Sequence, residues 1–373
     1  MSFSEQISLT PPLARTAFRR AAQAAGAELC EYSHPDKGPR SERLTTDVAW
    51  FGRRDAQRLL ILNSGTHGVE GLCGSNCQTS WILEGGPHTL PHDTAVILVH
   101  WINPYGVAWQ RRQCEGNVDL NRNFVDHTTG RYPPNPLYDR IHPWLVSPRL
   151  PAEARARADR ELETLRSELG SRPYSSAILV GQYTRPDGLF YGGRRPVWSN
   201  STFRSILAEH CGTAQSIAFL EYHTGLGPFG YGMLVTMHPP RSEPLRRASA
   251  WYGRSLCASL DNIERGTVTD DMPIATGFLA GAVEESSPGA AVTAVALEFG
   301  TFPLDEMIAL FREDAWLHAH EDPESPEGRA MRQKVEDFFY PRSADWLEMV
   351  ATRSRQVVRQ ALQGLAAEPL GNP

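Results

Sequence analysis

The sequence predicts an α/β fold: a mostly parallel, twisted mixed sheet that is flanked by helices and carries an inserted subdomain. A strand, loop, helix, strand order over residues 46–101 is a βαβ unit, and such units build parallel sheets. Buried strands return at 216–223 and 292–298, beyond a stretch that interrupts the pattern. The 373 residues also exceed the roughly 250–300 at which one core stops growing, so insertions or a second domain are expected.

Residues 1–126 are expected to form the first part of the core. The predicted elements are, in order, a helix at about 13–25, strands at 46–51 and 59–63, a loop at 64–71, a helix at 72–84 and a buried strand at 94–101. Turn residues follow each strand, and Gly85-Gly86 end the second helix.

Residues 127–203 interrupt this alternation and are expected to form an insertion near the functional site. The segment opens with many Pro, His and Tyr residues and no periodicity. The expected elements that follow are a charged helix over 152–169, a short strand over 177–180 and a loop over 181–198. Three leucines of the helix are expected to turn inward: Leu162, Leu165 and Leu169.

The core is expected to resume over residues 204–320, and residues 321–373 to form a helical tail. The expected elements of this second part are strands at 216–223, 231–237 and 292–298 and helices at about 244–260 and 303–320. The strands are short apolar runs, which is typical of strands that are buried on both faces.

Composition and charge exclude several classes of partner. The 37 Lys and Arg residues against 43 Asp and Glu give a net charge of −6, whereas nucleic acids and anionic membranes need a basic face. No apolar run approaches the ~20 residues of a membrane helix, and the N-terminus has no apolar signal segment. The six cysteines, Cys73 and Cys77 among them, are too sparse for a disulfide framework. We therefore expect a cytoplasmic protein, either a monomer or a homo-oligomer.

Metal-ligand residues follow three of the predicted strands. His67 and Glu70 come after strand 59–63, while His223 and Glu298 end the strands that begin at 216 and 292. Parallel strands bring such residues together outside their carboxyl ends. Two His and one Glu form a typical catalytic zinc set with one open position, where the pKa of a bound water falls to about 7. Glu298 is the natural acid and base for that water.

A further run, D-x-N-R-N-F over residues 119–124, completes a resemblance to a known family. The sequence resembles the M14 zinc carboxypeptidase superfamily, whose order and rough spacing are matched by these motifs and residues: His67-x-x-Glu70, Asn103-Pro104-x-Gly106, Arg112, the 119–124 run, His223 and Glu298. Within it, the segments 221–227 (EYHTGLG) and 181–200 are most similar to a bacterial branch, the DUF2817 group of proteins of unknown function. The resemblance covers about residues 40–320.

The resemblance implies a role for each matching residue. The two His and the Glu of the set would bind one zinc ion, and Glu298 would activate the water. Arg112 would polarise the scissile carbonyl and stabilise the oxyanion. Asn121 and Arg122 would hold a substrate carboxylate, which a guanidinium binds bidentately. The implied activity is zinc-dependent hydrolysis of an amide bond in a small molecule or short peptide that carries a carboxylate.

One departure from the family brings in a second activity. Typical members carry a Tyr about twenty residues before the catalytic Glu, but no Tyr occurs between positions 253 and 297. This favours an N-acyl amino acid deacylase of the aspartoacylase or desuccinylase type over an ordinary exopeptidase. Tyr183, Tyr191 and Arg194 of the insertion are either substitutes for that Tyr or only pack the insertion, and Tyr231 is another candidate pocket residue.

Two other function classes remain as alternatives. Gly225-x-Gly227-x-x-Gly230 matches a dinucleotide fingerprint after a strand, but the fingerprint needs a helix next, and residues 231–236 read as a strand. A metal-binding protein without catalysis would need a lost acid and base or a lost water position, whereas Glu298 and Arg112 are both present.

Overall fold

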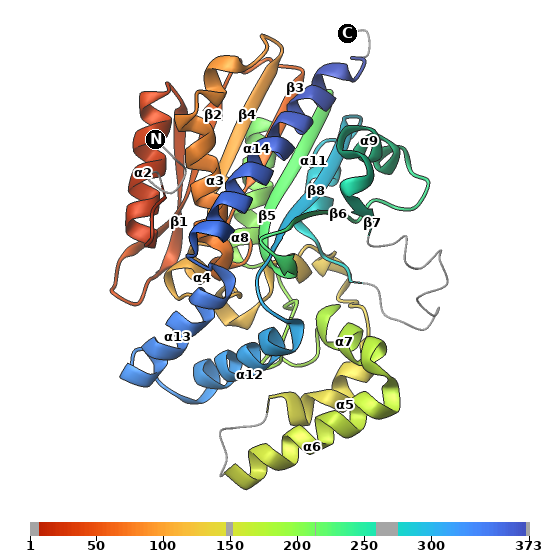
Figure 1. Cartoon of the computed structure of the whole chain (residues 1–373). Coiled ribbons are helices and arrows are strands. Elements are labelled where there is room, and N and C mark those ends of the chain that lie inside the picture. The colour runs from red at the N-terminus through yellow and green to blue at the C-terminus, as the bar shows by residue number, and fades with distance from the viewer. Residues whose placement is uncertain (1–6, 147–151, 213, 259–274, 371–373) are drawn as a thin grey trace.

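A mixed sheet runs through the molecule, and helices cover both of its faces (Figure 1). The computed structural model describes residues 7–146, 152–212, 214–258 and 275–370. Within these residues the sheet has eight strands in the order β1-β2-β4-β3-β5-β8-β6-β7. Their bounds are β1 Glu28–Lys37, β2 Arg43–Phe51, β3 Arg58–Asn63, β4 Thr94–His100, β5 Ser216–Phe229, β6 Gly232–Thr236, β7 Leu256–Ala258 and β8 Ala291–Gly300.

The four central strands, β4, β3, β5 and β8, are parallel to one another. On one side β2 and then β1 join antiparallel, and on the other β6 joins antiparallel with β7 parallel to it. Every residue of β3 and β4 is buried, because both faces of the sheet are covered. The predicted fold, a mostly parallel mixed sheet flanked by helices, is therefore confirmed.

Alternate residues of the central strands pack against opposite helical layers. Leu60 and Leu62 face the layer of α2 (Pro11–Ala24), α3 (Gly71–Leu83), α9 (Glu243–Tyr252) and α14 (Ala344–Ala367). Leu59 and Ile61 face the layer of α8 (Trp198–His210) and α11 (Leu279–Ser286). This period of two is the signature of a strand with two buried faces. Trp346 of α14 is fully buried, and its indole donates a hydrogen bond to the Gly300 carbonyl oxygen at the end of β8 (2.9 Å).

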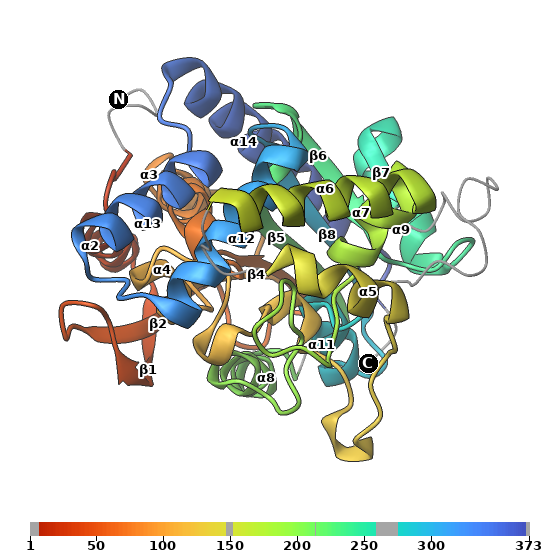
Figure 2. The same cartoon turned by 90° about the horizontal axis from the view of Figure 1, so that it is seen from below.

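A third group of helices lies beyond the carboxyl ends of the central strands (Figures 1 and 2). Its members are α5 (Pro136–Leu145), α6 (Ala152–Leu169), α7 (Ser171–Leu179), α12 (Leu304–His320) and α13 (Pro326–Phe339). They share one apolar cluster, in which Ile178 of α7 and Phe311 of α12 are buried. The short helix α4 (Pro104–Ala108) lies on the loop after β4. Leu162 of α6 is buried in this cluster, and Leu165 and Leu169 are partly buried against it.

Two predicted elements need correction. Residues 177–180 were expected as a strand, but they lie in and just after helix α7, because Tyr174, Ala177 and Ile178 bury one helical face at the spacing i, i+3, i+4. The helix expected over 244–260 ends at Tyr252, where Gly253 takes a left-handed φ of 65°, and β7 follows; residues 259–260 lie outside the described residues.

The region 127–203 contains α5, α6 and α7 and the loop that leads into α8. Helix α8 crosses the expected boundary at 203 and packs Phe203 against the sheet. The division of the chain at 127 and 203 remains a proposal. None of the helices in the described part of the chain is both long and apolar enough to span a membrane.

Candidate metal centre

Two strand ends and one loop place the candidate ligands. The loop after β3 carries His67 and leads into a 3-10 turn, Gly68–Glu70. His223 lies in β5 and pairs in register with Glu298 of the parallel strand β8, so the two side chains are neighbours on one face. The loop can approach α4 closely only because residue 68 is Gly: a Cβ there would lie 1.9 Å from the Gly106 carbonyl carbon.

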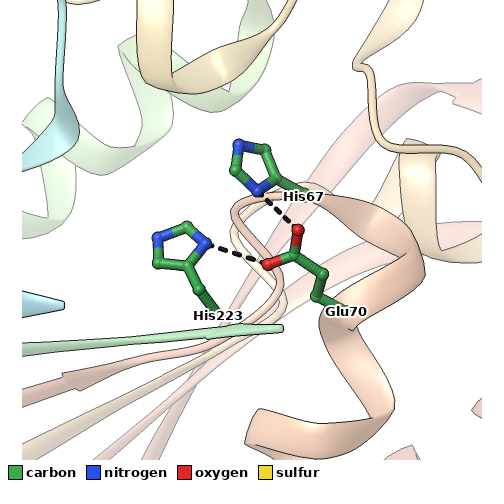
Figure 3. Close-up of side chains that lie close together, drawn as sticks. All are labelled: His67, Glu70 and His223. Atoms are coloured by element: carbon green, nitrogen blue, oxygen red, sulfur yellow. Dashed lines mark hydrogen bonds and ion pairs between the residues drawn. The ribbon is translucent and has the colours of Figure 1, made fainter. Parts of the chain in front are cut away.

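His67, Glu70 and His223 form one buried group (Figure 3). Each offers a ligand atom, and the three atoms lie within 4.8 Å of one another. The Glu70 carboxylate is shared: Oε1 lies 2.8 Å from His67 Nδ1 and Oε2 lies 2.9 Å from His223 Nδ1. Two imidazoles and a carboxylate at this spacing suit one zinc ion with an open fourth position.

Two further carboxylates face the far nitrogens of the same imidazoles. Glu221 Oε1 lies 3.2 Å from His223 Nε2, and Asp119 Oδ1 lies 3.4 Å from His67 Nε2. The other nitrogen of each ring, Nδ1, points to the Glu70 carboxylate. Carboxylates in this position orient metal-ligating imidazoles and fix their tautomer. Sequence reasoning assigned no role to either carboxylate. Glu221 could have been found from its spacing, because residues two apart in a strand lie on the same face and His223 was already a candidate ligand.

The charges in this group favour a cation. Burial alone would raise the pKa of Glu70, but the imidazoles of His67 and His223 lower it below its ordinary value. Burial alone would lower the pKa of His223, but Glu221 and Glu70 raise it well above its ordinary value. Counting Asp119 and Glu298, four carboxylates surround two imidazoles, so the residues present fit a bound dication.

Glu298 lies in a different environment from the other carboxylates. Burial raises the pKa of its carboxyl to about 7, although the charge of His223 acts in the opposite direction. The backbone N–H of Leu226 donates a hydrogen bond to its Oε1 (3.1 Å). A carboxyl with a pKa near neutrality can both accept and return a proton, as a general base and acid must.

Arg112 lies beside the group. Its Nε donates to Asp119 Oδ2 at 2.9 Å, and its Nη1 lies 3.5 Å from Glu70 Oε1. The guanidinium also lies over the Phe190 ring, 5.0 Å from the ring centroid. These contacts hold a fixed cation at the edge of the metal group.

Asn121 and Arg122 are both buried and make hydrogen bonds to the protein itself. The Asn121 amide donates to Glu221 Oε1 (3.2 Å), and its oxygen accepts the Leu279 N–H (2.9 Å). Arg122 donates to three backbone carbonyl oxygens: Val180 (2.9 Å), Asn121 (2.7 Å) and Leu179 (2.6 Å). Their role in substrate binding stays a prediction.

One cavity of about 720 Å³ contains all the predicted site residues in its lining: His67, Glu70, Arg112, Asn121, Arg122, His223 and Glu298. Residues of α7, β6, β8 and α11 are among the others that line it. The candidate substitutes for the missing Tyr do not belong to the lining that the described residues provide: Tyr183, Tyr191, Arg194 and Tyr231. Tyr183 donates instead to the Arg122 carbonyl oxygen (2.7 Å).

The glycine fingerprint has no helix after it. Residues 225–229 belong to β5, and β6 follows directly from Gly232. The phosphates of a dinucleotide would need a helix N-terminus at this point. The alternative of a dinucleotide-binding protein therefore has no structural support.

Comparison with known structures agrees with the sheet topology. Carboxypeptidase A from Helicoverpa armigera matches with a TM-score of 0.54 at 13% identity, over 98% of this chain and 75% of that one. Thrombin activatable fibrinolysis inhibitor (TAFI) matches with a TM-score of 0.50 at 12% identity, over 96% of this chain and 73% of that one. At such low identity these matches establish the fold alone. No curated protein matches the chain.

The family is established by the sequence itself. A family model described as "Protein of unknown function (DUF2817)" matches residues 10–353, which is most of the chain. The match confirms the resemblance found in residues 181–200 and 221–227, and the carboxypeptidase-like fold agrees with it. The chain is therefore a member of the DUF2817 family with an M14-like, carboxypeptidase fold.

Proposed function

We propose that this protein is a zinc-dependent hydrolase that cleaves an amide bond in a small, carboxylate-bearing substrate. The observation that carries the proposal is the buried group of His67, Glu70 and His223, whose ligand atoms lie within 4.8 Å of one another beside Glu298 at one cavity. One zinc ion is proposed per chain. All five cysteines whose side chains are described are free, which suits the cytoplasmic location that we include in the proposal.

The proposed chemistry divides among the residues of the cavity. Zinc, when bound, supplies Lewis acidity and lowers the pKa of a bound water to about 7. A carboxylate oxygen of Glu298 takes a proton from the attacking water, and Glu298 then returns this proton to the leaving nitrogen, a task that suits a carboxyl whose pKa is raised by burial. Arg112 donates to the carbonyl oxygen as negative charge develops there, a contribution of about 3 kcal/mol for one well-placed donor.

The substrate proposal depends on the size and charge of the cavity. A volume of about 720 Å³ fits a dipeptide or an acylated amino acid. With a dication bound, Arg112 and Arg122 add positive charge to the lining, so the cavity as a whole favours a substrate that carries a carboxylate.

A second candidate activity is deacylation of N-acyl amino acids. The lining that the described residues provide contains no Tyr, and the sequence has none between positions 253 and 297. A carboxypeptidase of the usual kind would close such a residue over its substrate. A panel that contains both dipeptides and N-acyl amino acids separates the two activities.

The test uses full-length protein that is purified without chelator. We expect about one zinc per chain and hydrolysis of at least one panel member. Glu298→Gln should retain zinc and lose at least about 100-fold in kcat, since general acid and base catalysis contributes that much. Absence of bound metal would contradict the proposal, as would full activity in Glu298→Gln. Zinc binding without hydrolysis of any panel member would contradict the proposed hydrolase and support the alternative of a metal-binding protein without catalysis.

A further inference from the structure

We propose that one face of helix α7 binds the substrate carboxylate, and that Arg122 holds this face in place instead of contacting the substrate. The face consists of Arg172, Ser175 and Ser176. The inference rests on the proposed function, because it names the part of the substrate that this wall of the cavity contacts.

Helix α7 presents two different faces. Arg172, Ser175, Ser176 and Leu179 follow the spacing i, i+3, i+4, i+7, so they lie on one side of the helix, and all four line the cavity. The opposite side is apolar and buried, and α7 packs there against α5 and α6, which sets the rotation of the helix: its members are Tyr174, Ala177 and Ile178. The polar face is therefore directed at the cavity by core packing.

The polar groups of this face have no protein partner. Neither the Arg172 guanidinium nor the hydroxyls of Ser175 and Ser176 form a hydrogen bond or ion pair with any described residue. By contrast, Arg112 and Arg122 already make hydrogen bonds to protein oxygens. The guanidinium can only donate hydrogen bonds, and the two hydroxyls, one helical turn away, can donate them as well. A surface of such donors suits an anion.

Arg122 binds the end of the same helix. Its three donor nitrogens reach the carbonyl oxygens of Leu179, Val180 and Asn121, at 2.6, 2.9 and 2.7 Å. The last carbonyls of a helix have no partner within the helix, so a cation there stabilises the end of α7. Since Arg122 follows Asp119 and Asn121 on one short segment, it ties α7 to the metal group.

The remaining walls indicate the rest of the substrate. Met233 and Val235 of β6 and Ala294 and Ala296 of β8 line the cavity with apolar side chains. An apolar substituent fits there while the carboxylate contacts α7. The inferred substrate class is the amide of an amino acid that has an apolar side chain and a free carboxylate.

Direct binding tests the inference without turnover. The probes are 3-phenylpropionate and its neutral analogue 3-phenylpropanol, titrated calorimetrically into full-length protein with zinc and after chelation. Wild-type protein should prefer the carboxylate in both states, because α7 supplies none of the metal-ligand residues. Arg172→Gln should weaken carboxylate binding by about 10- to 100-fold and leave the alcohol unchanged. Arg172→Lys should restore part of the preference, and Arg160→Gln, on the exposed face of α6, is the matched control.

A double-mutant cycle with Arg172 tests whether Arg122 acts through α7 or contacts the carboxylate itself. The single variant Arg122→Lys should have a reduced carboxylate preference. In the Arg172→Gln background the same change should cause no further loss of this preference, because Arg122 acts through α7. Additive losses would show that Arg122 contacts the carboxylate itself and would overturn the inference. A carboxylate preference that survives in Arg172→Gln, or that disappears with the metal, would overturn it as well. Lack of hydrolysis by wild-type protein would instead contradict the proposed function and leave the binding result intact.

Discussion

Glu221 is not one of the three candidate ligands, but its carboxylate orients the imidazole of His223, which is one of them. Its carboxylate oxygen Oε1 lies 3.2 Å from His223 Nε2 and accepts a hydrogen bond from Thr66 Oγ1 at 2.6 Å. The imidazole is thereby held with Nδ1 toward Glu70. A group in this position contributes to metal affinity by orienting the ligand, not by binding the ion.

We therefore predict that Glu221→Gln weakens zinc binding by about 10- to 100-fold. The amide can still reach His223, but it removes the charge that favours the correct tautomer. Competition with a chromophoric chelator measures the dissociation constant. Glu327→Gln, a change of the same kind at an exposed position of α13, should leave the constant unaltered. Equal affinities for wild type and Glu221→Gln would show that this carboxylate only fills space.

Gly68 is a second residue on which the centre depends. A Cβ at this position would lie 1.9 Å from the Gly106 carbonyl carbon, so Gly68→Ala must push the ligand loop away from α4. We expect a loss of about 1–3 kcal/mol in stability and a clear loss of bound zinc, measured by thermal unfolding and metal analysis. Gly281→Ala is the control, because a Cβ there meets nothing within 4 Å.

At the scale of single elements, β4 and α2 share a buried histidine. The ring of His100 stacks on Phe18 of α2 with centroids 4.3 Å apart, and its Nε2 lies 2.7 Å from Ser75 Oγ. Burial lowers the pKa of His100 well below its ordinary value, and the charges of Arg15 and Arg19 act in the same direction. His100 thus stays neutral in the folded protein when an unfolded chain would protonate it.

The sign of the pH dependence follows from this difference. The unfolded state binds the extra proton below about pH 6.5, so stability is complete above that pH and falls by up to ~1.4 kcal/mol per unit as the pH decreases. We predict that His100→Gln flattens the loss of unfolding free energy between about pH 6.5 and 5, as measured by urea titration. Exposed His88→Gln serves as the control. Parallel curves for wild type and His100→Gln would contradict the prediction.

Secondary structure could be predicted from the sequence where the hydrophobic pattern and the turn residues around it indicate a single type of element. The run Leu59–Leu62 is apolar because both faces of β3 are covered, and the strand predicted there is confirmed. The run 177–180 looks alike in composition but is helical, because Tyr174, Ala177 and Ile178 are buried at helical spacing in a cluster of helices with α5 and α6. Short apolar runs cannot be assigned by periodicity alone.

In the candidate site, the identity of several residues could be predicted from the sequence, but their contacts could not. Strand ends and motifs identify residues 67, 70, 223 and 298, which the fold brings to one cavity. The contacts of Arg122 with α7 could not be predicted, since they join segments nearly 60 residues apart in the chain. Motifs record which side chain occurs at a position, whereas its hydrogen-bond partners depend on the packing of the whole molecule.

At the scale of the whole molecule, the metal is expected to link the two parts of the core. His67 and Glu70 come from the segment before the helices α5 to α7, and His223 comes from the segment after them. Ligand binding to the folded state alone stabilises it by about 4 kcal/mol when the free ligand is 1,000 times its dissociation constant.

We predict that chelation lowers the melting temperature by several degrees and that added zinc restores it. The repulsion among the buried carboxylates adds to this loss once the cation is gone. Scanning calorimetry of protein with and without chelator is the measurement. His67→Ala should be nearly insensitive to chelator, and an unchanged melting temperature in the wild type would contradict a structural contribution from the metal.

The pairing of His223 with Glu298 has a consequence for the way the proposed site is built. The spacing between the proposed metal ligand His223 and the proposed proton acceptor Glu298 is set by the backbone separation of two neighbouring strands, about 4.8 Å, and by a continuous ladder from Ser216 to Gly225. The helices α5 to α7 contribute nothing to that spacing. If both proposals hold, the proposed reaction residues and the proposed carboxylate-binding face lie on separate parts of the chain, so changes in α5 to α7 can alter substrate choice without altering the spacing of His223 and Glu298.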